Sequence, residues 1–239
     1  STDYPNTRIG DEGNAEFALL SNPEPYLLES QWTGNSARDY AIVNTNTGAI
    51  TKILSKISGR VNLSPKAKYA YGYNSVDSTW FTFNLATKKI TNLTKGKVFY
   101  DELNDAPVSP RPYGSAGWTE NDASILLYDR YDIWEFNPEN GSSTKLTNGR
   151  ASKTSYRYIE FDREERFLDK KNKWLLYTFN ETTKNSGYFE FNPKNNKGKQ
   201  LLFNAYDFSE PIKAKDSDNV LFTKQSFEVF PDIIYSDLS

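Results

Sequence analysis

The 239-residue sequence contains no cysteine, no histidine and no methionine. Without Cys, disulfides, thiolate nucleophiles, zinc ribbons and iron–sulfur ligation are excluded, and the redox compartment stays undecided. Without His, Ser-His-Asp and Cys-His catalysis and His-based metal sites are excluded as well. The lack of Met means that there is no initiator residue, so we expect a processed molecule or a part cut from something longer.

An excess of charge of one sign and long apolar runs are also missing. Lys and Arg number 29 against 31 Asp and Glu, which gives a formal net charge of −2. Nucleic acids and anionic membranes attract a basic excess, so we expect neither as a partner. No run approaches the roughly 20 apolar residues of a membrane-spanning helix, and no charged-then-apolar signal segment begins the chain. We therefore expect no membrane insertion.

The sequence does contain a repeated phrase: a short strand, an asparagine, a turn and a second strand. Hydrophobic residues make up 37% of the chain and aromatic residues 15%, which favours sheets with one solvated face over a helical bundle. Asn, Pro and Gly suit the turns because Asn and Gly tolerate positive φ and Pro presets φ. The anchoring asparagines are Asn44, Asn84, Asn137 and Asn192, at spacings of 40, 53 and 55 residues.

This period predicts an all-β fold made of β-propeller blades. Repeats of about 40–50 residues with several short strands are typical of blades, each of four antiparallel strands whose apolar faces are covered by neighbouring blades. We predict one propeller domain or fragment over residues 1–239, with four to five blades, either closed or an open part of a larger propeller. Residues 1–30 indicate an incomplete leading blade, and residues 220–239 the start of a further blade. A β-sandwich is the alternative fold, but it does not explain the repetition.

Several motifs resemble one family of enzymes. Trp118-Thr-Glu-Asn-Asp122, the stretch Leu126–Trp134 and Lys145-Leu-Thr147 resemble the propeller of prolyl oligopeptidase/dipeptidyl peptidase IV-type serine peptidases, above all those of Bacteroidetes-like bacteria. Leu63-Ser-Pro65 and Phe230-Pro-Asp232 extend the resemblance, which reaches from about Trp32 to the C-terminus. It implies a propeller that covers a hydrolase domain of the parent chain and restricts which peptide substrates enter. It also implies a periplasmic or secreted protein.

The catalytic part of that family has no counterpart in this sequence. There is no Gly-x-Ser-x-Gly elbow, and Gly114-Ser-Ala-Gly117 lacks its spacing and its strand–helix context. The paired propeller glutamates with which the family's dipeptidyl peptidases bind the substrate amine have no convincing match either. We therefore expect no catalytic residue, no cofactor and no metal ligand, and no peptidase activity from this chain alone.

Two other functions remain open. The first is a stand-alone propeller that binds protein or peptide. The second is a carboxylate-based glycosidase, which needs two acidic groups facing each other at about 5–10 Å. Arg157 and Arg163 are candidates to bind a peptide carboxylate if they project into a central channel.

The acidic residues near turns are expected to be structural. Asp129 and Asp132 flank a hairpin tip, where an Asp accepts backbone N–H groups and locks the turn; a cation site is the alternative. The acidic loop at residues 101–105 is expected to be a solvated connection, because the ligand spacing of a calcium loop is absent. The tryptophans near predicted strands are expected to pack in the core instead of stacking on sugars. The motif residues that we single out are Trp118, Asp122, Asp129, Arg130, Asp132 and Trp134.

Overall fold

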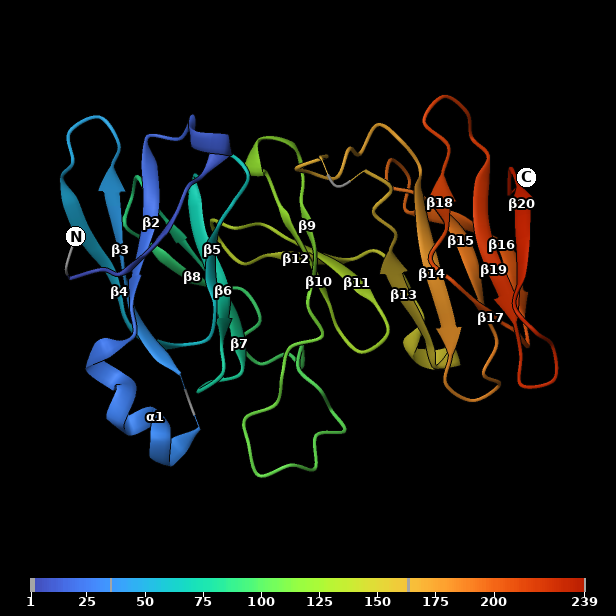
Figure 1. Cartoon of the computed structure of the whole chain (residues 1–239), viewed down its shortest axis with the longest axis horizontal. Helices are drawn as coiled ribbons and strands as arrows, with labels where there is room; N and C mark the ends of the chain where they lie inside the picture. The colour runs from blue at the N-terminus through green and yellow to red at the C-terminus, as the bar shows by residue number, and fades with distance from the viewer. Residues whose placement is uncertain (1–2, 35, 163, 239) are drawn as a thin grey trace. The chain divides into compact units, whose positions relative to one another are not determined.

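The computed structural model describes residues 3–34, 36–162 and 164–238. Within these residues the strands form five antiparallel sheets of four strands each (Figure 1). The prediction of an all-β fold of four to five propeller-type blades is therefore confirmed, and a sandwich, which has two facing sheets, does not describe it. The one α-helix of the described residues has seven residues, and none of their helices is long and apolar enough to span a membrane.

The chain divides into two compact units. The first comprises Ser1–Gly114, Trp118–Ile125 and Phe136–Ser143. The second comprises Ser115–Gly117, Leu126–Glu135 and Thr144–Ser239. The first, second, fourth and fifth sheets each belong to one unit, whereas the third sheet contributes residues to both.

The first sheet is a complete blade. Its strands, in the order β1-β2-β3-β4, are β1 (Asn6–Arg8), β2 (Phe17–Asn22), β3 (Ala37–Asn44) and β4 (Ile50–Ser58). Strands β1 and β2, which lie within the segment expected to form a leading blade, are the first two strands of this four-stranded sheet. The sequence signal was weak because all three residues of β1 are exposed and show no apolar alternation. Helix α1 (Leu27–Thr33), inserted between β2 and β3, also interrupts the strand pattern (Figure 1).

The second sheet packs against the first inside the same unit. Its strands, in the order β5-β6-β7-β8, are β5 (Val61–Leu63), β6 (Tyr69–Asn74), β7 (Thr79–Asn84) and β8 (Ile90–Asn92). The shared core contains buried side chains from both sheets, among them Leu19, Ile42, Val61, Phe81 and Phe83. Mutual covering of apolar sheet faces is what the blade prediction requires.

The third sheet follows the same strand order. Its strands are β9 (Ser115–Trp118), β10 (Ile125–Tyr128), β11 (Ile133–Phe136) and β12 (Ser143–Lys145). A short 3-10 turn (Glu120–Asp122) connects β9 to β10. The central strand β10 is buried along its whole length.

The second unit contains the fourth and fifth sheets. The fourth consists of β13 (Thr154–Tyr158), β14 (Trp174–Asn180), β15 (Ser186–Asn192) and β16 (Lys197–Asn204), in chain order. The fifth consists of β17 (Asp207–Phe208), β18 (Ile212–Lys213), β19 (Val220–Gln225) and β20 (Asp232–Ser236). The first strand of this sheet begins at Asp207, and β17 and β18 have only two residues each. A core that includes Ile159, Tyr188 and Phe222 joins the two sheets.

The fifth sheet differs from the others in width. Leu221 of β19 pairs with Ile212 on one side and with Tyr235 on the other. Lys224 likewise pairs with Phe208 and with Asp232. Strands β17 and β18 therefore lie along the same edge of β19, opposite β20, and this sheet is three strands wide.

The repeated asparagines build one kind of turn. The side-chain Oδ1 of Asn44, for example, accepts the backbone N–H groups two and three residues ahead, at 3.0 Å each. Gly48, four residues ahead, has a left-handed φ of 73° and donates its N–H to the Asn44 carbonyl. The bonds to both N–H groups recur at Asn84, Asn137 and Asn180. Asn192 shows the bond to the N–H two residues ahead. The sequence analysis did not single out Asn180, which follows the second strand of its blade instead of the third.

Candidate functional site

In the first unit, Asp122 fixes the turn between β5 and β6. Its carboxylate is buried, with 2% of the residue exposed. It accepts the Ser64 hydroxyl at 2.5 Å and the backbone N–H groups of Lys66 and Lys68 at 3.1 and 3.2 Å. The Ser64 hydroxyl in turn accepts the N–H of Tyr69 at 3.0 Å. These bonds occupy the carboxylate with structural partners.

Trp118 packs on the same region of the second sheet. Its ring stacks on Tyr69 with centroids 5.5 Å apart and meets Tyr71 edge-on at 5.1 Å. Burial raises the pKa of Tyr69, and the hydrogen bond from its hydroxyl to Glu139 raises it further. Tyr69 is therefore a neutral donor at physiological pH, and the Trp118–Asp122 motif lies in packed structure.

In the second unit, the carboxylate of Asp129 accepts backbone N–H groups of the hairpin between β10 and β11, whereas that of Asp132 accepts a backbone N–H group of the segment after β12. Asp129 Oδ1 accepts the N–H groups of Tyr131 and Asp132 at 2.8 and 2.6 Å, and its Oδ2 accepts the indole N–H of Trp134 at 3.0 Å. Asp132, which is fully buried, accepts the N–H of Gly149 at 2.5 Å. Asp129 thus shows the bonding pattern of a turn-locking aspartate, whereas Asp132 ties the hairpin to the segment at Gly149.

Arg130 forms a two-point ion pair at this hairpin. Its guanidinium holds Glu181 through two bonds, Nε to Oε1 at 2.9 Å and Nη2 to Oε2 at 2.7 Å. The Tyr131 hydroxyl donates to Oε2 at 2.7 Å. The Arg130 hydrogen bond holds the pKa of Glu181 below its ordinary value. Two-point pairing of this kind fixes geometry as well as charge.

Arg157 supports the same hairpin from strand β13. Its guanidinium donates to the carbonyl oxygens of Tyr156, Arg130 and Asp129 at 2.8, 2.9 and 3.2 Å. It also lies 4.7 Å from the ring centroid of Tyr128. The other arginine that we considered for peptide binding, Arg163, lies outside the described residues.

The remaining acidic and aromatic candidates have ordinary surroundings. In the described part of the chain, no group of three or more acidic side chains is arranged to hold a metal ion. Within the acidic loop, Asp101 accepts the N–H of Leu103 at 3.0 Å. Trp80 and Trp174 are buried, as a packing role requires, and Trp134 is half-buried. The aspartates most relevant to the glycosidase alternative, Asp129 and Asp132, are those already bonded to backbone N–H groups.

The first unit also contains a cavity of about 510 Å³ that no expectation from the sequence included. Arg8 of β1, Arg38 of β3 and Arg60, between β4 and β5, all line it. We call it the arginine cavity. The strand register explains how the first two arginines meet. Arg8 of β1 pairs with Leu19 of β2. Two residues further along β2, Ser21 pairs with Tyr40 of β3, and Arg38 lies two residues from Tyr40 on the same strand. Alternate residues share a face of a sheet, so these side chains line one face of the first blade.

The segment that carries Arg60 is held over this face. The Tyr40 hydroxyl donates to the Gly59 carbonyl at 3.0 Å and accepts the N–H of Val61 at 3.2 Å. Gly59 has a φ of 141°, and a Cβ there would lie 2.1 Å from the Tyr73 carbonyl oxygen. Only glycine fits this close approach, so the backbone on either side of Arg60 is fixed. No linear pattern marks the cavity, because its arginines come from three separate segments.

Five antiparallel four-stranded sheets with packed faces define a protein of the β-propeller class. No protein-family model matches the sequence, and no curated protein matches it significantly. Among solved structures, the chain is similar to dipeptidyl peptidase 4 of Porphyromonas gingivalis, with a TM-score of 0.61 and 11% identity over 98% of this chain and 38% of that one.

Two further structures show a comparable likeness. A dipeptidyl aminopeptidase IV described as putative, from Bacteroides ovatus, matches with a TM-score of 0.58 and 12% identity over 97% of this chain and 38% of that one. A structure from a study of two prolyl endopeptidases matches with a TM-score of 0.55 and 13% identity over 98% of this chain and 33% of that one. The chain thus spans only 33–38% of the length of these proteins. The similarity is one of fold, in blades like those of peptidase propeller domains.

Proposed function

We propose that this chain is the propeller portion of a prolyl oligopeptidase-like serine peptidase, and that it restricts the access of peptides to a hydrolase domain of the parent protein. The observation that carries the proposal is the likeness of almost the whole chain to a third of three peptidase structures, with TM-scores of 0.55 to 0.61. The sequence motifs around Trp118 and Trp134 support the same family. For a periplasmic or secreted location, the support is the family resemblance alone.

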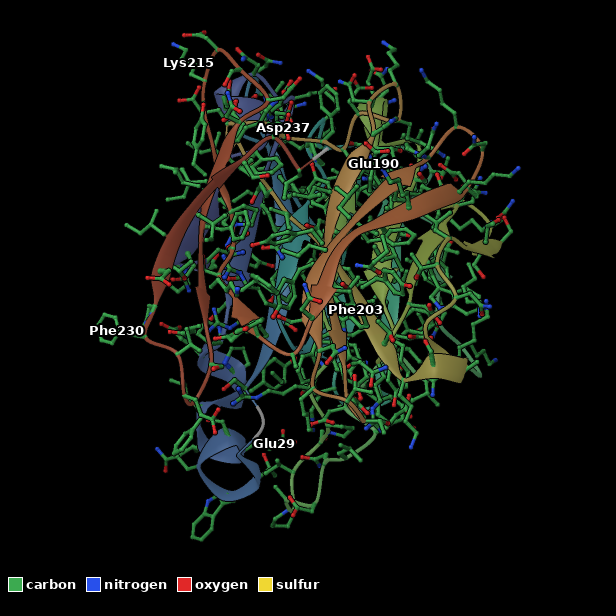
Figure 2. All side chains as sticks on the ribbon, turned by 90° about the vertical axis from the view of Figure 1, so that its right-hand side faces the viewer. Glu29, Glu190, Phe203, Lys215, Phe230 and Asp237 are labelled. Atoms are coloured by element: carbon green, nitrogen blue, oxygen red, sulfur yellow. The ribbon has the colours of Figure 1, made fainter. Side chains whose placement is uncertain are left out.

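The surface of the fifth blade agrees with a chain that packs on further protein. Five apolar side chains within ten residues are exposed there: Phe227, Val229, Phe230, Ile233 and Tyr235. Phe230 is 88% exposed and points away from the sheet (Figure 2). Strand β20 is also an edge strand, because its described pairing is with β19 alone. In each of the other four sheets, the third strand pairs with a fourth strand on its outer side. Exposed apolar groups beside an open strand edge are typical of a surface that another segment covers.

The reading frame beyond the codon for Ser239 tests the proposal directly. A frame that continues into a segment with a Gly-x-Ser-x-Gly elbow, followed by Asp or Glu and His, would supply the missing catalytic groups. A stop codon at that point would refute the proposal and favour a stand-alone propeller that binds protein or peptide.

Kinetics of the full-length product test the gating role. A propeller that restricts entry should make kcat/KM fall steeply with substrate size, so that proline-containing peptides are cleaved and a folded protein carrying the same site is not. Equal cleavage of both would contradict the gating role while leaving the family assignment intact. The 239-residue chain alone, which has no His to act as general base, should release no product from the same peptides.

A further inference from the structure

The arginine cavity concentrates positive charge without a matching acid. Arg8, Arg38 and Arg60 line it, and no Asp or Glu is among its described lining residues. Loss of hydration, together with the nearby charges of Arg60 and Arg38, lowers the pKa of Arg8. Guanidinium groups stay protonated in proteins. The cavity therefore holds three like charges in a chain whose net charge is −2.

These arginines differ from the arginines of the second unit in how their donors are used. Arg130 is paired with Glu181, and Arg157 donates to three carbonyl oxygens. Within the described residues, Arg8 donates through Nη1 to the side-chain oxygen of Asn62 and to the Val61 carbonyl, whereas the side chains of Arg38 and Arg60 form no hydrogen bond or ion pair. Each guanidinium has five N–H donors. Most donors of the three arginines are consequently left for another acceptor.

The walls of the cavity add neutral donors in fixed positions. Ser21, Ser58 and Ser75 line it beside the arginines. The Ser75 hydroxyl and N–H both donate to the Ser58 carbonyl, at 3.0 and 2.7 Å. The bonds of Tyr40 to the backbone on either side of Arg60 fix that segment of the wall. A preformed cavity of 510 Å³ lies within the roughly 300–1,000 Å³ range of small-molecule sites.

We propose that the arginine cavity binds a small dianionic ligand through carboxylate or phosphate oxygens. Guanidinium groups present paired N–H donors that match the spacing of oxygens in these groups. Three cations favour a ligand with more than one negative charge, and the hydroxyls of Ser21 and Ser58 can donate to oxygens that the arginines do not reach. The inference rests on the cavity alone and is independent of the peptidase assignment.

Calorimetric titration of the 239-residue chain with sodium phosphate and, separately, with sodium succinate tests the proposal at constant ionic strength. We expect saturable binding of at least one probe, weaker binding of the monoanion acetate, and an affinity that falls with added sodium chloride. Tighter binding of phosphate would identify a phosphate ester as the ligand class, and tighter binding of succinate a dicarboxylate. Failure of both probes to saturate in the millimolar range would overturn the proposal.

Three variants locate the binding. Arg38→Gln and Arg60→Gln should each weaken binding about tenfold or more, because each removes charge-assisted bonds to the ligand. Neither side chain has a hydrogen-bond partner in the described structure, so the melting temperature without ligand should not fall. Arg111→Gln removes the same charge from an exposed residue outside the cavity, and it should bind like the wild type. An equal loss in this control, or no loss in the two cavity variants, would refute the assignment.

Discussion

Replacement of Asp122 by alanine should destabilise the first unit strongly. The carboxylate is buried and accepts three donors: the Ser64 hydroxyl and the N–H groups of Lys66 and Lys68. A hydrogen bond to a charged group contributes about 1.5–3 kcal/mol, and a buried donor left without a partner carries a further desolvation cost. Because the three bonds share one carboxylate, their losses do not add fully. We expect the free energy of unfolding to fall by about 3–5 kcal/mol.

The backbone at this position adds a second contribution. Asp122 has a φ of 57°, in the left-handed region that costs an ordinary L-residue about 1–2 kcal/mol and is tolerated best by Gly, Asn and Asp. Asp122→Asn keeps the shape, one acceptor oxygen and the backbone preference, so it should cost only about 1–2 kcal/mol. Asp122→Gly removes the carboxylate without the strain of alanine, so it should fall between the two.

Hydrogen–deuterium exchange provides the decisive assay, supported by urea unfolding followed by circular dichroism. With two compact units, unfolding of the whole chain need not follow one two-state transition, whereas exchange reports the local opening free energy. Asp122→Ala should accelerate exchange in β5 and β6 and leave β14 and β15 unchanged. Asp77→Ala, which removes an exposed carboxylate from the turn after β6, is the matched control. The reasoning is wrong if Asp122→Ala lowers the stability by less than about 1 kcal/mol and leaves exchange in β5 and β6 at the wild-type rate.

Three further predictions concern other turns and the hairpin ion pair. Asn137→Ala should cost about 1–2 kcal/mol in chemical denaturation by removing its turn bonds, and Asn137→Asp should recover most of that loss; equal losses would contradict this role. Gly59→Ala should lower stability by about 3 kcal/mol, seen as a lower melting temperature, because its Cβ would meet the Tyr73 carbonyl at 2.1 Å; an unchanged melting temperature would show that the backbone relaxes freely. The pairing of Glu181 with Arg130 depresses the pKa of Glu181, so its contribution to stability is complete above the ordinary value of 4.5 and is lost as the pH falls through the depressed value. The stability difference between the wild type and Glu181→Gln should therefore shrink in denaturation curves at acidic pH, and a constant difference would exclude the linkage.

The repeated turn explains why much of the fold was predictable from sequence. The side chain of Asn84 caps its own turn, and Lys88 four residues ahead takes the left-handed conformation. This chemistry is local, so it can be read from a short window and places the strands on either side. The strand boundaries near the two ends of the chain were harder to predict from the sequence. Strand β1 has no buried residue, and β17 and β18 have two residues each, so they are defined by their pairing partners and not by their own composition.

The candidate sites show the same division between local and long-range determinants. The turn bonds of Asp129 involve Tyr131 and Asp132, immediate neighbours in the chain, and their form followed from the sequence. The partner of Arg130 is Glu181, which is 51 residues away and could not be deduced.

The arginine cavity depends entirely on contacts between residues that are distant in the sequence, so it could not be predicted from the sequence. Arg8 and Arg38 share a face only because β1 and β3 pair with opposite edges of β2 in one particular register. A shift of one residue in that register would turn one of the two side chains to the other face and separate the charges. Arg60 joins them through the bonds of Tyr40 to the neighbouring backbone. Three like charges gathered by pairing alone oppose folding of the empty chain, since their mutual repulsion is not offset by a described acid. A bound dianion would offset that repulsion, so ligand binding and the stability of the first blade should rise together, and the melting temperature should increase with probe concentration in the wild type more than in Arg60→Gln.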